Sequence, residues 1–232
     1  MEQIGIYLEY LFQLIYPNLC LACEQHPKAK DQLCCTTCMS KLYYTELHLQ
    51  KENTFTQHFW GRVEIESAAS FLYYSKESPA QKLIQKLKYN KKSNIGVKLG
   101  EEHGELLKES PFFKNIDLII PVPLHPKKEY QRGYNQSWMY AKGLAKAMKK
   151  PLSNKHLHRV KNTQTQTKKS RMERVQNTND AFTLTNADAL IGKHLLIVDD
   201  VMTTGATLEA CALKLQVVEN IKISLATLAI AK

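Results

Sequence analysis

The segment LLIVDDVMTTGATLEA, residues 195–210, restricts the possible folds of this chain most strongly. Four apolar residues, then two acids and a turn of small residues, indicate a buried strand that ends just before a helix. Open α/β sheets bind ligands at the carboxyl ends of their strands, where such a turn lies. The segment therefore predicts an α/β domain with a ligand site after this strand.

The residue types of this turn fit a phosphorylated sugar. Asp199 and Asp200 can accept hydrogen bonds from vicinal sugar hydroxyls, while Gly205 lets the backbone approach an anion closely. The following helix directs its N-terminal donors and positive dipole end at the same point. We expect the phosphate contacts to come from Thr203, Thr204, Gly205, Ala206 and Thr207. A TGAT turn alone can simply cap a helix, but the adjacent acids favour the phosphosugar interpretation.

The remaining segments continue the α/β pattern. Strands are expected over 63–74, as one strand or a hairpin, over 116–123 and over 221–230. Helices are expected from Pro79, capped by Ser78, and over 95–107, 135–149 and 206–218. Strands that alternate with helices predict a mainly parallel sheet.

Two CxxC pairs, Cys20 with Cys23 and Cys35 with Cys38, stand 11 residues apart near the N-terminus. Without a secretion signal, such pairs indicate metal ligands rather than disulfides. Four thiolates at this spacing predict a closed, tetrahedral, structural zinc site, with four reduced, unpaired thiols as the alternative.

The other potential ligands have simpler explanations. Cys34 forms no CxxC with Cys38, so we assign it to packing, and Cys211 lies on the apolar face of the last helix as a core residue. His26 is near enough in sequence to replace one thiolate.

Residues 43–60 show no clear period and are interpreted as a linker. This puts a domain boundary near residue 58, between a lobe over 1–58 and an α/β domain over 59–232. Residues 160–179 are polar and basic, and a loop of this length in a compact domain is usually functional or mobile.

The N-terminal sequence MEQIGIYLEYLFQLIYP lacks a basic region and a small-residue cleavage site, so it is not a convincing signal peptide. We expect an amphipathic helix packed on the protein, with a membrane-surface helix as the alternative; its apolar positions are Ile4, Leu8, Leu11 and Ile15. No stretch is long enough to span a bilayer, and a cytoplasmic location is expected.

The formal charge of +10 is unevenly placed, because residues 114–174 hold 15 lysines and arginines against 3 acidic residues. Such a region suits phosphates of a small ligand or of nucleic acid. Tyr130, Tyr134 and Trp138 lie among these charges and could stack on single-stranded bases, although we expect Trp138 to face the core. For Lys142, Lys146 and Lys149 we prefer the interpretation that they are solvated surface charges rather than ligand contacts.

Several stretches together resemble the ComF family, which is associated with DNA uptake in competent bacteria. They are the paired CxxC, LIQKLKYNKK, PVPLHPKKEYQRGYNQS, HRVKNTQTQTKKSRMERVQNTNDAF and LLIVDDVMTTGAT, the last resembling the phosphoribosyl-pyrophosphate signature of type I phosphoribosyltransferases. They follow the family's order and cover nearly the whole chain. The resemblance implies an α/β fold of type I phosphoribosyltransferase type, with a mainly parallel sheet and a small N-terminal zinc-ribbon-like lobe.

The resemblance also implies site roles. Asp199 and Asp200 would contact the ribose hydroxyls and residues 203–207 the 5′-phosphate, while Pro123 and Leu124 match the pyrophosphate loop. Mg²⁺ would bridge ligand oxygens. Asp199, Asp200 and Arg132 would be the catalytic residues. Further polar contacts with the ligand are expected from Asn135, Gln136, Arg159, Thr163, Gln166, Arg171 and Arg174.

Two functions follow from these expectations. The first is Mg²⁺-dependent phosphoribosyl transfer to an unidentified acceptor, since the sequence identifies no base-specific pocket. The second is a non-catalytic protein that senses a phosphosugar while its zinc lobe and basic region hold single-stranded DNA. Its partners would then include DNA-uptake proteins.

Overall fold

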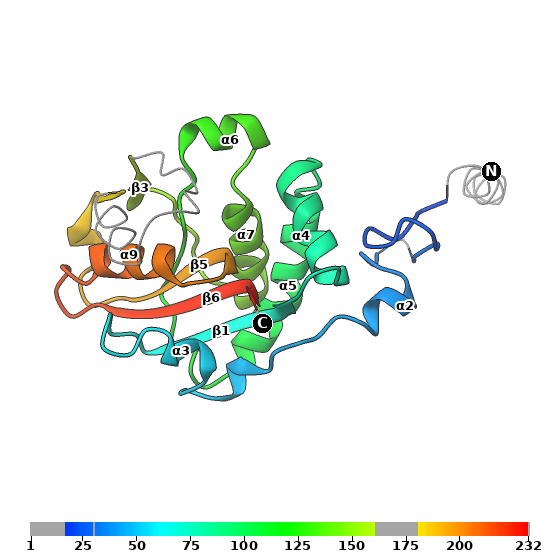
Figure 1. Ribbon diagram of the computed structural model, residues 1–232. Helices are drawn as coiled ribbons and strands as arrows, with labels where there is room; N and C mark the ends of the chain where they lie inside the picture. Colours follow the sequence, from blue (N-terminus) through cyan, green and yellow to red (C-terminus); the bar gives the residue numbers. More distant parts are fainter. Residues whose placement is uncertain (1–16, 30, 161–180, 232) are drawn as a thin grey trace, which may run out of the picture.

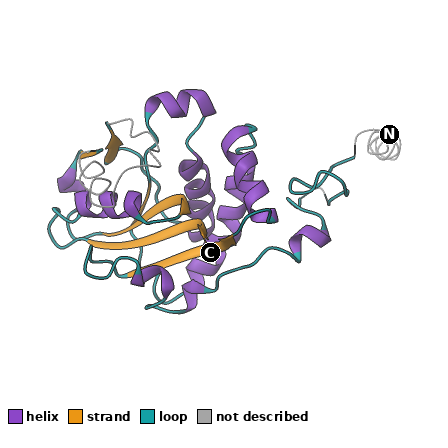
Figure 2. Ribbon diagram, viewed as in Figure 1, coloured by secondary structure: helices purple, strands orange, loops and turns teal. Residues whose placement is uncertain are grey.

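The computed structural model describes residues 17–29, 31–160 and 181–231 (Figures 1 and 2). The expected N-terminal helix and all but the first residue of the expected loop over 160–179 lie outside the described residues. No helix in the described part is long and apolar enough to cross a membrane.

Four parallel strands form the central sheet in the order β1-β6-β5-β2. Their bounds are Ser67–Tyr74 for β1, Leu118–Pro121 for β2, His194–Met202 for β5 and Lys222–Ala231 for β6. The central strands β5 and β6 are apolar over most of their length because helices or packed loops cover both faces. The expected parallel α/β sheet is confirmed, and β1 is one strand rather than a hairpin.

Alternate residues of β5 point to two different core clusters. Leu196 and Val198 contact the side of α4 (Pro79–Tyr89), α5 (Asn94–Glu109) and α7 (Gln136–Met148). Leu195 and Ile197 contact the side of α9 (Ala206–Leu215). Figure 1 shows the sheet between these two layers. The ends of β2 and β5 therefore open between the α7 layer and the α9 layer.

Helices α5 and α7 approach each other closely through glycines. A Cβ placed on Gly100 would collide with the carbonyl oxygen of Tyr140, and one on Gly143 with that of Val97. The sequence analysis predicted both helices but not their contact, because small residues mark a close approach without showing its partner.

The interpretation of residues 43–60 as a linker is wrong. They form the short helices η1 (Leu47–Leu49) and α3 (Thr54–Gln57), and Phe55 and Phe59 are fully buried in the cluster on the α9 side. Asn53 caps α3 and also donates to the carbonyl of Ala68 in β1 at 2.9 Å. Elements this short show no period, so the pattern missed them. The domain boundary near residue 58 stays a prediction.

Five further short elements were not predicted. They are α2 (Thr36–Met39), α6 (Pro126–Arg132), the 3₁₀ helix η2 (Ala187–Leu190) and the antiparallel pair of β3 (Leu157–Arg159) with β4 (Phe182–Leu184). Helix α6 buries none of its residues, so it has no apolar face for a pattern to reveal.

Candidate functional site

The two acids of the DD pair occupy the carboxyl-terminal half of β5 and are partly buried. The Ser137 hydroxyl on α7 donates to Asp199 Oδ1 at 2.8 Å, and the Asp200 backbone N–H donates to the same oxygen at 2.8 Å. These two donors orient the Asp199 carboxyl group. Ser137 was not predicted as a site residue, because it lies 62 residues away from Asp199 in the sequence.

The pKa of Asp199 lies far above the usual range of an aspartate. Burial is the main reason that the pKa of Asp199 rises to about 7, and the neighbouring charge of Asp200 raises it further. The hydrogen bond from Ser137 acts in the opposite direction but does not outweigh the burial. Around pH 7 the Asp199 carboxyl group can therefore gain or lose a proton.

The turn after β5 has the geometry of an anion cradle. Gly205 adopts a left-handed backbone with φ of 77° and is the N-cap of α9 without a side-chain cap, so the first N–H groups of the helix face the turn. A Cβ on Gly205 would stand 3.1 Å from the Phe59 ring, which closes the turn from behind. Thr203 and Thr204 are exposed, and Ala206 and Thr207 are partly exposed.

The end of β2 meets the end of β5 at the same edge of the sheet. Val122 donates its backbone N–H to the carbonyl of Val198 at 2.8 Å, just before the acid pair. Pro123 and Leu124 follow and line a pocket of about 300 Å³ beside α6, α7 and β3. Trp138 lines this pocket too and is only partly buried, which corrects its expected position in the core.

Basic groups from α6 and β3 surround this loop. Burial, followed by the charges of Arg159 and Arg132, lowers the pKa of Lys128, which shows that the three cations share one region. Arg132 donates to Gln136 Oε1 at 2.7 Å and stacks 5.6 Å from the Tyr89 ring centre, without a described hydrogen bond to either acid.

The other predicted polar contacts divide into two groups. Asn135 caps α7 and holds the β2 loop by donating to the carbonyl of Val122 at 3.0 Å, and Gln136 is buried next to it. The expected contacts in the basic loop, Thr163, Gln166, Arg171 and Arg174, lie outside the described residues.

Helix α4 supplies a site residue that the sequence analysis did not identify. Lys88 Nζ lies 3.0 Å from Asp200 Oδ2, and the Tyr134 hydroxyl donates to the carbonyl of Leu87 at 2.6 Å. The motif LIQKLKYNKK carried the family resemblance, but nothing in its pattern showed that Lys88 reaches β5.

The N-terminal lobe brings its four predicted ligands together. The sulfur atoms of Cys20, Cys23, Cys35 and Cys38 all lie within 4.8 Å of one another. Cys35 caps the short helix α2 that carries Cys38, which places the second CxxC pair on one turn. This compact set of four thiols fits the closed tetrahedral coordination that Zn²⁺ prefers.

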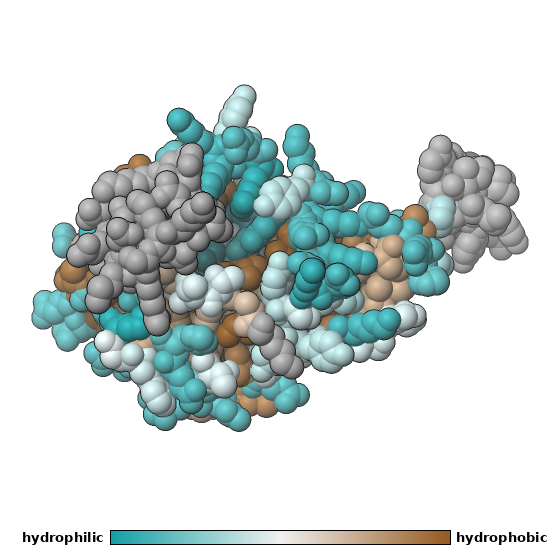
Figure 3. All heavy atoms as spheres, viewed as in Figure 1, coloured by the Kyte–Doolittle hydropathy of each residue, from teal (hydrophilic) through white to brown (hydrophobic). Residues whose placement is uncertain are grey.

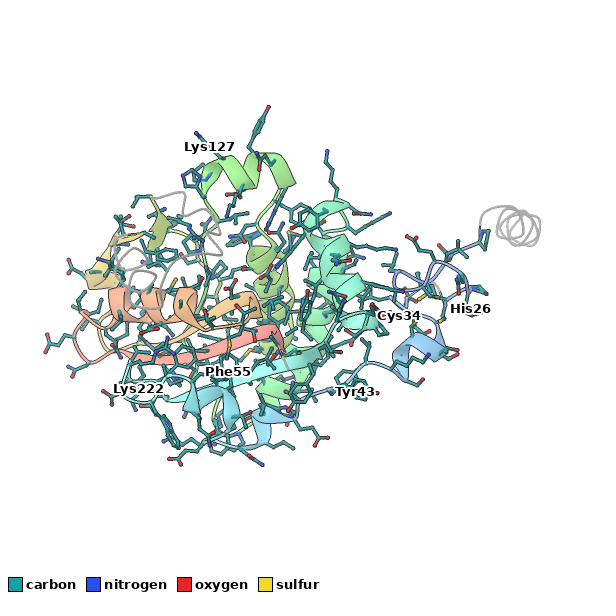
Figure 4. The ribbon with its side chains drawn as sticks, viewed as in Figure 1. His26, Cys34, Tyr43, Phe55, Lys127 and Lys222 are labelled. Atoms are coloured by element: carbon teal, nitrogen blue, oxygen red, sulfur yellow. The ribbon has the colours of Figure 1, made fainter. Side chains whose placement is uncertain are left out.

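The thiols of the cluster differ in how easily they ionise: burial and the neighbouring cysteines raise the pKa of Cys38, whereas the pKa of Cys20 is lowered. Burial opposes ionisation of Cys20, but backbone N–H groups, including those of Ala22 and Cys23, outweigh it and lower the pKa of Cys20 to about 6. Burial raises the pKa of Cys34 to about 12, consistent with its assigned packing role. His26 is exposed and does not belong to the sulfur cluster (Figure 4).

The cysteine lobe contacts the helices of the α4 layer. Glu24 forms an ion pair with Lys86 of α4, and Lys98 of α5 donates to the backbone carbonyl of Asp31 at 2.7 Å. Cys20 and Cys34 are buried in the same apolar cluster as the inner faces of these helices. Figure 1 shows the lobe beside α4.

Similarity to known proteins agrees with this arrangement. The family model described as "Phosphoribosyl transferase domain" matches residues 135–231, which include the acid pair and the following turn. Solved structures give weaker likenesses: a hypoxanthine phosphoribosyltransferase from Staphylococcus aureus is 17% identical with a TM-score of 0.37, over 58% of this chain and 62% of that one. A likeness of that size carries no argument about function.

Relatives in sequence cover up to 82% of the chain. "DNA utilization protein YhgH" of Salmonella typhimurium is 31% identical over 137 residues, 58% of this chain and 60% of that protein. "Competence protein ComFC" of Bacillus subtilis is 30% identical over 95 residues, 41% of this chain and 36% of that protein. "Competence protein F" of Haemophilus influenzae is 30% identical over 199 residues, 82% of this chain and 81% of that protein. The chain therefore belongs to the competence protein F (ComF) family, and it joins a phosphoribosyltransferase-type domain to a cysteine lobe.

Proposed function

We propose that the protein binds phosphoribosyl pyrophosphate together with Mg²⁺ at the edge of the sheet formed by β2 and β5. The observation that carries this proposal is the acid pair at the end of β5, followed at once by the uncapped N-terminus of α9. Carboxylates suit ribose hydroxyls, and converging N–H groups suit a phosphate. The ligand supplies most of the Mg²⁺ ligands itself, so a dedicated metal cage is not needed.

Each part of the ligand has a matching part of the site. Asp199 and Asp200 would accept hydrogen bonds from the ribose hydroxyls, and residues 203–207 would surround the 5′-phosphate. The pyrophosphate would lie near Pro123 and Leu124. Positive charge is concentrated there by Lys128, Arg132 and Arg159 and is complementary to the negative charge of the ligand.

The same arrangement supports transfer of the phosphoribosyl group. The bond between the anomeric carbon and pyrophosphate would break as the acceptor forms its bond to that carbon, and the ribose ring would carry positive charge in between. The carboxylates of Asp199 and Asp200 would stabilise that charge, and Arg132 would stabilise the leaving pyrophosphate. The acceptor is not identified by any of these residues.

Calorimetry tests the binding proposal. The double variant Asp199→Asn with Asp200→Asn should lose about tenfold or more in affinity for Mg²⁺ and phosphoribosyl pyrophosphate, because each substitution removes a charge-assisted acceptor. The exposed Asp188 on η2 provides the control, since Asp188→Asn should keep the full affinity. Unchanged affinity in a folded double variant would remove the ribose assignment.

Catalysis requires a separate experiment. The wild-type protein, incubated with labelled phosphoribosyl pyrophosphate and a panel of nucleobases and other acceptors, should release pyrophosphate with at least one of them. Ligand binding without pyrophosphate release across the panel would instead favour a sensor.

A role in handling single-stranded DNA is the second candidate, and the exposed surface of α6 favours it. Tyr130 is 91% exposed, and the exposed Lys127 precedes it by three residues, on the same face of a helix with no buried residue. Figure 3 shows hydrophilic residues over α6 and Figure 4 shows Lys127 at its outer side. An exposed aromatic ring among cations can stack on bases while the cations contact phosphates. The DNA utilization and competence proteins among the relatives agree with this candidate.

A further inference from the structure

The ion pair between Lys88 and Asp200 crosses from α4 to the ligand edge of β5. The Lys88 Nζ atom lies 3.0 Å from Asp200 Oδ2, with side-chain exposures of 23% for Lys88 and 14% for Asp200. Helix α4 precedes the segment matched by the phosphoribosyl transferase model, residues 135–231. A charged group from outside the matched segment therefore contacts one of the two central acids.

The ion pair is not needed to hold α4 on the sheet. Leu83, Ile84 and Leu87 of α4 are almost completely buried in the core. The hydrogen bond from Tyr134 to the carbonyl of Leu87 fixes the end of the helix as well. Because packing and a hydrogen bond already anchor α4, the cation at position 88 calls for a different explanation.

Charge balance at the acid pair supplies that explanation. Two adjacent carboxylates in a partly buried site repel each other, and ribose hydroxyls cannot neutralise them because they carry no charge. Lys88 forms an ion pair with Asp200, and its charge also acts to lower the pKa of Asp199. An ammonium group has three donors, so the contact with Asp200 leaves two for another acceptor.

We propose that Lys88 belongs to the ligand site as a positioning residue: its ammonium group offsets the negative charge of the acid pair, holds the Asp200 carboxylate in place for ribose hydroxyls, and donates its remaining hydrogen bonds to phosphate oxygens of the same ligand. This inference rests on the proposed function, since it assumes a ribose phosphate at the acid pair. It extends the site to α4 and gives the LIQKLKYNKK segment a chemical role.

Three variants separate this role from a structural one. Lys88→Gln keeps most of the side-chain length but removes the charge, and Lys88→Arg keeps the charge. Lys82→Gln is the matched control, because Lys82 lies on the same helix and is exposed. Thermal unfolding of all three identifies any variant that does not fold.

The first measurement needs no ligand. Carbon-13 NMR of the Asp199 carboxyl group during a pH titration reports its pKa directly. The charge of Lys88 acts to lower the pKa of Asp199, so Lys88→Gln should raise that pKa, while Lys88→Arg and Lys82→Gln should leave it close to the wild-type value. An unchanged titration in Lys88→Gln would overturn the inference.

The second measurement is calorimetry with Mg²⁺ and phosphoribosyl pyrophosphate. Lys88→Gln should weaken binding by about tenfold or more, Lys88→Arg should recover most of the affinity, and Lys82→Gln should bind like the wild type. Equal or tighter binding by Lys88→Gln would overturn the inference, even if the titration had shifted, because the ion pair would then not assist the ligand.

The two measurements also separate this inference from the proposed function. If the wild-type protein binds the ligand and Lys88→Gln binds it equally well, the proposed function stands and the inference fails. If the wild-type protein does not bind phosphoribosyl pyrophosphate, the proposed function fails, and with it the ligand contact; the titration still decides whether Lys88 controls the acid pair.

Discussion

At the scale of single residues, Asp199 combines burial with a neighbouring charge. Its folded-state pKa is about 7, compared with 3.8 for an unperturbed aspartate. A carboxyl group with a raised pKa binds its proton more tightly in the folded protein than in the unfolded chain. Its contribution to the free energy of unfolding therefore decreases as pH rises from about 4 to 7 and stays low above that range.

The variant Asp199→Asn removes this titration while keeping an oxygen for Ser137. At pH 8 the variant should be more stable than the wild type by about 1 kcal/mol or more, since one pKa unit corresponds to about 1.4 kcal/mol. Near pH 4, where the wild-type carboxyl group is protonated, this advantage should disappear. Denaturant unfolding at several pH values measures the difference, with Asp188→Asn as the control. An advantage that does not change with pH would show that Asp199 is not the titrating group.

The four clustered cysteines lead to a second prediction at this scale. Protein purified without chelator should carry about one zinc ion per chain, and Cys20→Ser or Cys38→Ser should lose it and destabilise the lobe. Cys34→Ala is the matched control, because Cys34 is buried beside the cluster but is not one of the four ligands. Elemental analysis and limited proteolysis measure both effects. Zinc loss in the control, or zinc retention in Cys20→Ser, would contradict the assigned ligand set.

At the scale of elements, the contact between α5 and α7 positions Ser137 and the start of α7 at the site. The helices lie so close that Gly100 and Gly143 each face backbone of the other helix. Backbone cannot move aside as a flexible side chain can, so an added methyl group must push the helices apart.

Gly143→Ala should therefore destabilise the protein by about 1–3 kcal/mol, the usual range for an overpacked core. Alanine is a better helix former than glycine, so helix propensity alone predicts that Gly143→Ala would stabilise the protein. Lys142→Ala, one residue away on the exposed side of α7, should change stability little. Urea unfolding of the two variants gives the comparison. A Gly143→Ala protein as stable as the wild type would mean that the helices pack less closely than described.

At the scale of the whole molecule, the basic region has two candidate ligands. Lys168, Lys169 and Arg171 lie outside the described residues, and from the polar sequence of their segment we expect closure over pyrophosphate. Lys127 lies on α6, on the same face as the exposed ring of Tyr130.

Two multiple variants distinguish these ligands. Lys127→Ala with Tyr130→Ala should weaken binding of single-stranded DNA and reduce its salt dependence, because fewer counterions are released. The triple change of Lys168, Lys169 and Arg171 to Ala should mainly weaken binding of phosphoribosyl pyrophosphate. Fluorescence anisotropy with a labelled oligonucleotide and calorimetry with the ligand measure both. If neither variant alters DNA binding, these residues do not form a DNA-binding surface.

Features whose chemistry lies in one short stretch could be predicted from the amino-acid sequence alone. The apolar run before DD, the small residues of the turn and the two CxxC pairs are each local, so they predicted β5, α9 and the set of four thiols. The alternation of strands and helices likewise predicted the parallel sheet. Short, exposed or aperiodic elements such as α3 and α6 gave no such signal.

The distant residues that complete the site became apparent from the folded structure. Ser137 reaches Asp199 from α7, Lys88 reaches Asp200 from α4, and Phe59 closes the back of Gly205 from a segment interpreted as a linker. Each contact depends on helix packing and strand order, which bring together residues far apart in the chain. The chemical type of a side chain can be seen at its own position in the sequence, whereas the residue that it contacts depends on how the whole core packs.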